Sequence, residues 1–196
     1  MFNDLSSPLA LLATRRSGRP RDLVAPGPTA VQLRAILEIA TRSPDHGKLH
    51  PWRFVHIPRA GRAAFAALLD QAYRADHPDP GRLELEANER FAHQAPELIV
   101  ALSSPTPGIK IPLWEQELSC GAACMNLLLA AHAAGFAGGW VTGWAAYSPR
   151  VLAAFGAPPE RIAGFIFLGT PGAALEERQR PDYGEVVSEW ESQILP

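Results

Sequence analysis

The chain has 196 residues, a formal net charge of −2 and 47% hydrophobic residues. This length suits one domain with a sizeable core, and the near-neutral charge argues against general nucleic-acid binding, which usually needs a basic face. Two cysteines occur, Cys120 and Cys124, so a disulfide framework is not indicated. We find neither a signal-peptide pattern nor an apolar run of transmembrane length, and we expect a cytoplasmic protein with no membrane or nucleic-acid partner.

A short helix is predicted to begin after Ser7, because serine caps helices well and Pro8 suits the first helical position. The helix leads into Arg15-Arg16-Ser17-Gly18-Arg19-Pro20-Arg21, which we call the arginine segment. The planar donor fork of arginine matches phosphate oxygens, and its charge does not titrate away. Taken alone, the segment is either an anion site for one phosphate of a cofactor or a solvated basic arm.

The clearest helix begins with the capping-box pair Thr29 and Gln32. Apolar residues at helical spacing extend it to about residue 42, where the Ser43-Pro44 pair ends it. A polar, turn-rich loop follows and delivers the chain into an alternating segment over residues 52–57, which predicts a strand.

Two histidines of this loop, His46 and His50, are four residues apart, a spacing that can bind a metal when it lies on a helix. Here the pair lies in a loop rich in proline and glycine and lacks a third clustered ligand, so we expect no metal. Cys120 and Cys124 have the same spacing inside a helical pattern. We interpret them as small core residues rather than as a redox pair.

The middle of the chain is predicted to contain three helices and one buried strand. Helical spacing covers residues 61–76 and 82–93, and the continuous apolar run over residues 98–102 predicts the strand. The longest helix is expected from about residue 112 to residue 134. It is apolar nearly all round in its second half, which is typical of a helix in the centre of a core.

Two further strands are predicted over residues 138–144 and 163–171, separated by a short helix that begins at Ser148-Pro149. The tail from residue 172 has too few large apolar residues for a core of its own, so we expect it to pack on something else, such as a second subunit. Helices dominate without strict strand–helix alternation. The predicted fold is therefore α+β, with a small sheet wrapped by helices.

The sequence carries no glycine-rich dinucleotide fingerprint, no phosphate-binding P-loop and no nucleophile elbow. Its carboxylates are isolated, so no acid–base pair is evident. Three tryptophans, Trp52, Trp140 and Trp144, lie beside glycine or proline at predicted strand edges. They either fill the core or form a wall for a planar ring.

Four segments carry a joint pattern, in this order: the helix that ends in Arg15-Arg16-Ser17, the capped helix that runs through Arg42-Ser43-Pro44-Asp45-His46 to Pro51-Trp52-Arg53-Phe54, the long helix opened by Trp114-Glu115-Gln116-Glu117 with Gly139-Trp140 beyond it, and the stretch from Gly164-Phe165 to Gly169-Thr170-Pro171. Together they resemble the nitroreductase superfamily of FMN-dependent oxidoreductases, most closely its small bacterial branch. The resemblance implies one domain over residues 1–196 with a mainly antiparallel sheet. It also implies an intertwined homodimer, in which the tail from about residue 172 packs on the partner.

The resemblance further implies two FMN sites at the subunit interface. Arg15, Arg16 and Ser17 would hold the FMN phosphate and ribityl chain, and Arg19 would lie near the flavin. Arg180, in the tail, resembles a basic residue that many members place on the phosphate.

A second group would reach the same FMN from the other subunit. Arg42 and His46 supply these contacts in the resemblance, and Pro44 and Asp45 shape their loop. Ala130 matches a position assigned to the nicotinamide nucleotide in the close branch.

A third group, Trp140, Val141 and Thr142, would lie along the flavin ring. Val141 stands where close relatives carry arginine, so a polar contact is missing there. The implied activity is hydride transfer from NADH or NADPH through flavin N5 to a nitroaromatic, quinone or similar electron-poor acceptor, by a ping-pong mechanism. Two alternatives keep the fold and FMN: an oxygen-dependent flavin enzyme and a non-catalytic flavin carrier.

Overall fold

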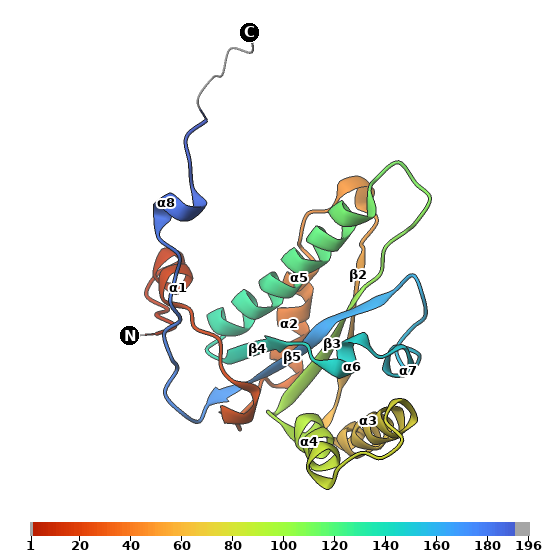
Figure 1. The fold of residues 1–196 in the computed structure, drawn as a ribbon. Helices are drawn as coiled ribbons and strands as arrows, with labels where there is room; N and C mark the ends of the chain where they lie inside the picture. Colours follow the sequence, from red (N-terminus) through yellow and green to blue (C-terminus); the bar gives the residue numbers. More distant parts are fainter. Residues whose placement is uncertain (1, 191–196) are drawn as a thin grey trace.

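The computed structural model describes residues 2–190, which form one five-stranded antiparallel sheet with helices on both faces (Figure 1). The central strand is β5 (Arg161–Pro171), which pairs with β3 (Glu97–Ser103), β4 (Ala137–Val141) and β1 (Leu23–Val24). Within the described residues, β2 (Trp52–Ile57) pairs with β3 only and forms an edge of the sheet. The architecture confirms the predicted α+β class and the antiparallel sheet.

Alternate residues of the central strands face two separate cores. Leu98 and Val100 of β3 and Phe165 of β5 belong to one core, while Ile99 and Ile166 belong to the other. All five are 0% exposed. The alternation follows from the two-residue repeat of a strand, and burial on both sides explains why these strands read as continuous apolar runs.

The helices divide between the two faces. α2 (Ala30–Ala40) and α5 (Leu113–Ala133) cover one face, and the other is covered by α3 (Arg62–Asp76), α4 (Arg82–His93), α6 (Trp144–Tyr147) and α7 (Pro149–Leu152) (Figure 1). The capping box of α2 forms as predicted, with Thr29 N donating to Gln32 Oε1 at 2.9 Å and Gln32 N donating to Thr29 Oγ1 at 3.3 Å. Over residues 2–190, no helix combines the length and the apolar character that crossing a bilayer requires.

The N-terminal helix and the tail lie together at one side of the body (Figure 1). α1 (Pro8–Thr14) is capped by Ser7, whose Oγ accepts a hydrogen bond from Ala10 N at 3.0 Å. The tail passes the arginine segment and forms the short helix α8 (Tyr183–Val186). Residues 191–196, which belong to the predicted partner-packing tail, lie outside the described part of the chain.

Two local predictions are corrected by the structure. β4 ends at Val141 and not at residue 144, because Gly143, with φ 113°, turns the chain so that Trp144 begins α6. No strand is predicted between the arginine segment and Thr29, but the structure has β1 there, in which Leu23 pairs with Pro171 and Val24 with Thr170. Two residues are too few to give an alternating pattern, so this strand depends on its distant partner.

Candidate active site

The arginine segment lines a hollow of about 380 Å³ together with β4 and the tail. Gly18 N donates to Gly138 O at 3.0 Å, which fixes the segment against the start of β4. The backbones approach so closely that a Cβ at Gly139 would collide with Gly18 O. Glycine is therefore required at residue 139 for the segment to reach the strand.

Arg15 has the chemistry of an anion ligand. Its Nη1 donates to Ser17 Oγ at 3.3 Å. Burial, followed by repulsion from Arg180 and Arg16, lowers the pKa of the Arg15 guanidinium. Several positive charges thus share one partly buried place, and a bound anion would relieve their repulsion. A phosphate group fits this donor set.

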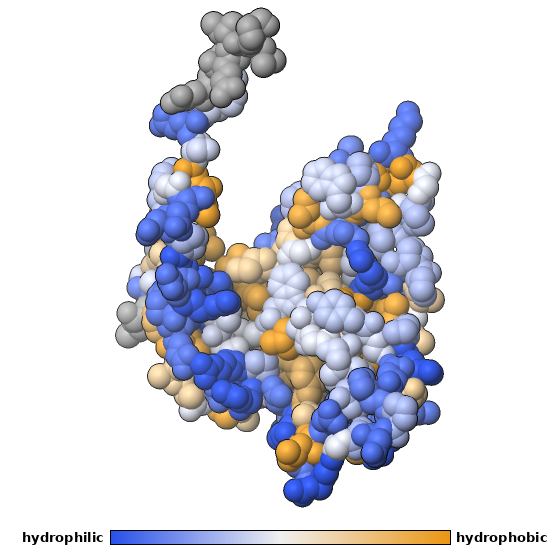
Figure 2. Space-filling view, in the orientation of Figure 1, coloured by the Kyte–Doolittle hydropathy of each residue, from blue (hydrophilic) through white to orange (hydrophobic). Residues whose placement is uncertain are grey.

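The neighbouring arginines are already engaged by the tail. Arg16 pairs with Glu177 and stacks over the Phe2 ring, with its guanidinium carbon 4.7 Å from the ring centroid. Its Nη1 also donates to Arg15 O at 2.9 Å. Arg19 pairs with Glu176, and Arg180 lies 3.5 Å from Glu177. Hydrophilic side chains gather along this side of the molecule (Figure 2). The structure thus brings together the residues that were predicted to surround the phosphate. It adds two carboxylates, Glu176 and Glu177, that the sequence did not reveal.

Trp140 forms a wall beside this hollow. Its Nε1 donates to Ala163 O at 3.0 Å, and the indole lies directly over Gly164, where any Cβ would collide with it. The ladder between β3 and β5 is irregular at this point, because Ala101 pairs with Gly164 and Leu102 with Ile162. Because residue 164 is glycine, the indole can approach the backbone of β5 at this bulge. No sequence pattern predicted that the bulge and Gly164 would belong to this site.

Trp140 also lines a second hollow, of about 450 Å³. Thr142, Tyr147 and Arg161 are among the residues that line it. Arg161 pairs with Glu117 of α5 at its edge. Since Trp140 borders both hollows, an elongated ligand could extend from the arginine segment past Trp140 and Val141 into the second hollow.

The remaining predicted flavin contacts lie elsewhere. His46 Nδ1 is 3.0 Å from Glu115 Oε2, and Pro44 O accepts a hydrogen bond from Ser119 Oγ at 2.6 Å. Asp45 caps its own loop by accepting from His50 N at 3.1 Å, while Arg42 is exposed. His46 and Pro44 therefore contact the N-terminal half of α5, at Glu115 and Ser119.

The two groups of predicted contacts are far apart within one chain. The arginine segment contacts β4 at Gly138, just beyond the C-terminal end of α5, whereas His46 contacts Glu115 in its first turn. At 1.5 Å per residue, the helix between these points spans roughly 25 Å. The two groups also lie toward opposite ends of α5 in Figure 1. A single chain does not bring them together around one flavin.

Ala130, the predicted nicotinamide contact, lies inside α5. It is 6% exposed and belongs to the core between α5 and the sheet. Neither hollow beside Trp140 is lined by it. Its assignment stays a prediction that the described residues do not support.

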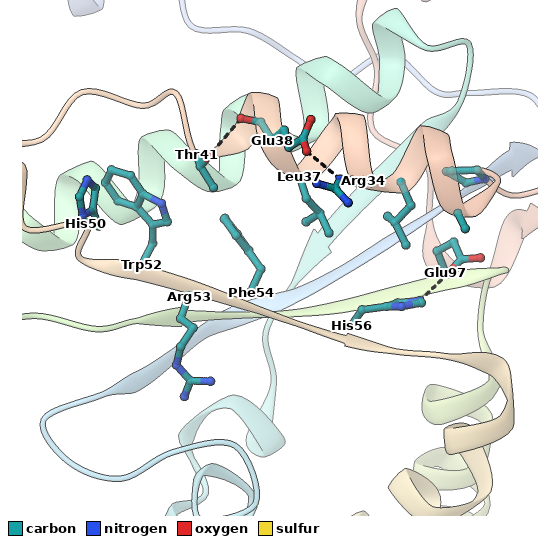
Figure 3. Close-up of a pocket in the computed structure, with 13 residues that line it drawn as sticks. Arg34, Leu37, Glu38, Thr41, His50, Trp52, Arg53, Phe54, His56 and Glu97 are labelled. Atoms are coloured by element: carbon teal, nitrogen blue, oxygen red, sulfur yellow. Dashed lines mark hydrogen bonds and ion pairs between the residues drawn. The ribbon is translucent and has the colours of Figure 1, made fainter.

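A third hollow, which the sequence did not indicate, separates α2 from β2 and measures about 860 Å³ (Figure 3). We call it the α2–β2 groove. Its apolar lining includes Leu33, Leu37, Trp52 and Phe54. In Figure 3 the Leu37, Trp52 and Phe54 side chains point into the space between helix and strand. The groove runs along the sheet edge, where β2 leaves one row of backbone groups without a strand partner among the described residues.

These features define an α+β protein with an arginine-lined hollow beside the strand that follows its longest helix. The chain belongs to the nitroreductase family, whose model matches residues 12–170. An Escherichia coli protein provisionally named NAD(P)H nitroreductase YdjA is 40% identical over 164 residues, which cover 83% of this chain and 87% of that protein. The predicted resemblance is thereby confirmed.

Solved structures agree on the fold. A nitroreductase-like protein from Bacillus cereus has a TM-score of 0.78 at 21% identity, covering 95% of this chain and 97% of that chain. A Desulfovibrio desulfuricans protein, described as a nitroreductase in complex with FMN, has a TM-score of 0.70 at 21% identity and covers 95% and 99%. The Vibrio harveyi NADPH:FMN oxidoreductase complexed with NAD+ reaches 0.68 at 19% identity and covers 93% and 76%.

Proposed function

We propose that the protein is an FMN-dependent NAD(P)H oxidoreductase that reduces nitroaromatic, quinone or similar electron-poor acceptors by a ping-pong mechanism. One observation carries this proposal: Trp140 lines both the arginine-lined hollow and the second hollow. FMN has a phosphate and a planar ring joined by a flexible chain, and this arrangement matches the two hollows in order. The name of the Escherichia coli relative and the FMN in the Desulfovibrio desulfuricans structure support the same cofactor and donor.

In this proposal, Arg15 and Ser17 hold the phosphate through charge-assisted and hydroxyl hydrogen bonds. The main chain of β4 runs beside the ring, and Trp140 and Val141 keep water from one side of it. When bound, FMN supplies the redox chemistry by accepting a hydride at N5 and passing it to the acceptor. The nicotinamide and then the acceptor would occupy the same open face of the ring, and the use of one space in turn favours ping-pong kinetics.

We propose a homodimer in which each flavin site takes Arg42 and His46 from the partner. The roughly 25 Å of helix between the two contact groups supports this, because a second copy can supply the missing group. Exposed apolar side chains support it too. Leu9 of α1 is 79% exposed, and Trp114 and Leu118 of α5 are 61% and 63% exposed. Side chains of this kind are typical of surfaces that a partner covers.

Mixed dimers test this assembly. Arg15→Ala and Arg42→Ala should each weaken FMN binding when tested alone. When the two variants are unfolded together and refolded as mixed dimers, one site of each mixed dimer regains both arginines, so about one quarter of all sites should bind normally. No recovery would mean that both arginines act within one chain, and refolded single variants provide the control.

We also propose that the tail packs in the α2–β2 groove of the partner. Tyr183, Val186 and Trp190 leave the body with 78%, 65% and 86% of their surfaces exposed. The α2–β2 groove has an apolar lining that suits these apolar tail side chains, and its open strand edge can pair with an extended segment. Leu37→Asp in the groove and Trp190→Asp in the tail should each shift the protein toward monomers in sedimentation experiments. Leu83→Asp, on the exposed side of α4, is the control and should leave the assembly unchanged.

The first test of the proposed activity is an anaerobic absorption spectrum of the purified protein after addition of FMN, then NADPH, then NADH. Flavin bands that bleach would support the reductase and identify its donor. Bands that persist would instead favour a flavin carrier, and a protein that never binds FMN would overturn the proposal. We place the enzyme in the cytoplasm, where NAD(P)H is available and where the buried free thiols Cys120 and Cys124 are stable.

A further inference from the structure

The tail places two consecutive carboxylates on the arginine segment. Glu177 pairs with Arg16 and lies 3.5 Å from Arg180, while Glu176 pairs with Arg19. Of the four arginines predicted to contact FMN in this region, Arg16, Arg19 and Arg180 therefore already face a carboxylate of the chain itself. Arg15 differs from them, because its side-chain partner in the described residues is the neutral hydroxyl of Ser17.

We propose that Glu176 and Glu177 act as an internal anion. They hold the arginine segment in the flavin-free protein and release some of its arginine contacts when a flavin phosphate binds. The inference rests on the proposed FMN site. Both carboxylates are well exposed, at 49% for Glu177 and 66% for Glu176, so either can move into water. The partner of Glu177, Arg16, is only 12% exposed at its side chain and stays fixed by backbone carbonyls.

The charges suggest an order of events. An arriving phosphate dianion meets Arg15 and Ser17 first, because no carboxylate occupies them in the described structure. Arg180 is the next group to exchange, since its contact with Glu177 is long at 3.5 Å and its side chain is 55% exposed. A dianion beside Glu177 repels that carboxylate, so binding of the phosphate loosens the tail from the arginine segment. Because the same tail is proposed to dock on the partner, flavin loading and assembly become coupled.

The competition has a defined sign. Removing the two negative charges should tighten the binding of a ligand that carries a phosphate and should not change the binding of the same ligand without it. Riboflavin is that matched ligand. The difference between FMN and riboflavin should also shrink as salt rises, because exposed charges are screened within about 10 Å at 0.1 M ionic strength.

The experiment compares the double variant Glu176→Gln/Glu177→Gln with wild type by titrating FMN and riboflavin against the full-length protein and following flavin fluorescence. We expect FMN to bind about three- to ten-fold more tightly at low salt, with riboflavin unchanged. The matched control is Glu185→Gln/Glu189→Gln, which removes the same charge from the same tail and should change neither ligand.

Three outcomes separate the inference from the proposed function. FMN binding that is unchanged or weaker in the Glu176/Glu177 variant, while Arg15→Ala still abolishes the phosphate preference, overturns the inference and leaves the flavin site standing. Tighter FMN binding in the Glu185/Glu189 control as well would mean that the effect comes from net charge, and this outcome also overturns the inference. A wild-type protein that binds neither flavin overturns the proposed function itself. Glutamine keeps the shape of glutamate, and thermal unfolding curves of both variants verify that the protein stays folded.

Discussion

Two regions of the molecule concentrate arginine, and they use its charge differently. At the start of α3, Arg62 is 2% exposed and donates to four backbone carbonyls, those of Ile57, Ala92, Gln94 and Pro96, at 2.9–3.2 Å. In the arginine segment, Arg15 has one neutral hydroxyl and two positive neighbours. A buried guanidinium that main-chain oxygens satisfy is a structural device. A guanidinium crowded by like charges is suited to bind an anion.

Electrostatics supports this division. Burial lowers the pKa of the Arg62 guanidinium, and the nearby Glu97 acts in the opposite direction. For Arg15, burial is also the main cause of its lowered pKa, but the nearby charges, Arg180 and Arg16, add to the effect. The first environment compensates its charge with protein groups. The second gives Arg15 a neutral hydroxyl and like charges. We therefore expect substitutions in the two regions to affect different properties.

The largest effect should come from Arg62→Met, which keeps the length of the side chain and removes its donors. Four buried carbonyls then lose their common partner, and the free energy of unfolding should fall by about 3–5 kcal/mol. Urea unfolding measures the change. Arg59→Met, on the exposed turn before α3, is the control and should change stability little. Equal stability in the two variants would contradict a structural role for Arg62.

His132 sharpens the comparison, because it lies behind the arginine segment. It is 0% exposed and both ring nitrogens lack a partner in the described residues. Burial, and secondly the charge of Arg15, lowers its pKa to about 4. An unfolded histidine titrates near pH 6.5, so between pH 6.5 and pH 4 the unfolded state binds the proton and the folded state does not. Stability is therefore complete above pH 6.5 and falls as the pH drops through this window, by up to about 3 kcal/mol.

Urea unfolding at a series of pH values measures this loss. In His132→Leu the dependence between pH 6.5 and pH 4 should become shallower, whereas His93→Gln, on the exposed end of α4, should keep the wild-type slope. Arg15→Ala should reduce the slope in part, because it removes the second cause of the low pKa of His132. If His132→Leu and Arg15→Ala both keep the wild-type slope, the acid sensitivity does not come from His132.

The sequence predicted the strongly patterned elements well, and each success has a physical reason. α2 carries a capping box, α5 is apolar on nearly all sides, and β3 and β5 are continuous apolar runs, so their signals are local. The arginine segment could be identified as a candidate anion site because its charged residues are close together in the sequence.

Long-range features escaped prediction. Glu177 is 161 residues from Arg16, and nothing in the tail composition identifies it as a partner. The carbonyls that hold Arg62 come from two separate segments, the end of β2 and residues 92–96. The need for glycine at residue 164 is explained only by the indole of Trp140, which lies over it. The distance between Arg42 and the arginine segment likewise depends on α5, which separates them. Pairing between distant residues is set by the fold, and a single sequence carries no direct record of it.

Arg15→Ala should weaken FMN binding by roughly ten- to one-hundred-fold, since a charge-assisted hydrogen bond contributes about 1.5–3 kcal/mol. Riboflavin binding and the free energy of unfolding should change little, in contrast to Arg62→Met. Fluorescence titration with both flavins measures the effect. Arg21→Ala is the matched control, because this side chain is 69% exposed at the other end of the same segment. Unchanged FMN affinity in Arg15→Ala would contradict the phosphate assignment.

The smallest effect is expected from Ser17→Ala, which removes a neutral donor from the same place. A neutral hydrogen bond contributes about 0.5–1.5 kcal/mol, so FMN binding should weaken by roughly two- to ten-fold. Ser17 Oγ also accepts from Arg15 Nη1 at 3.3 Å, so the hydroxyl positions the guanidinium as well as touching the ligand. The double variant Arg15→Ala/Ser17→Ala should therefore lose less FMN-binding free energy than the sum of the losses in the two single variants. Strict additivity would mean that Arg15 reaches the phosphate without help from Ser17, and the site would then depend on charge alone.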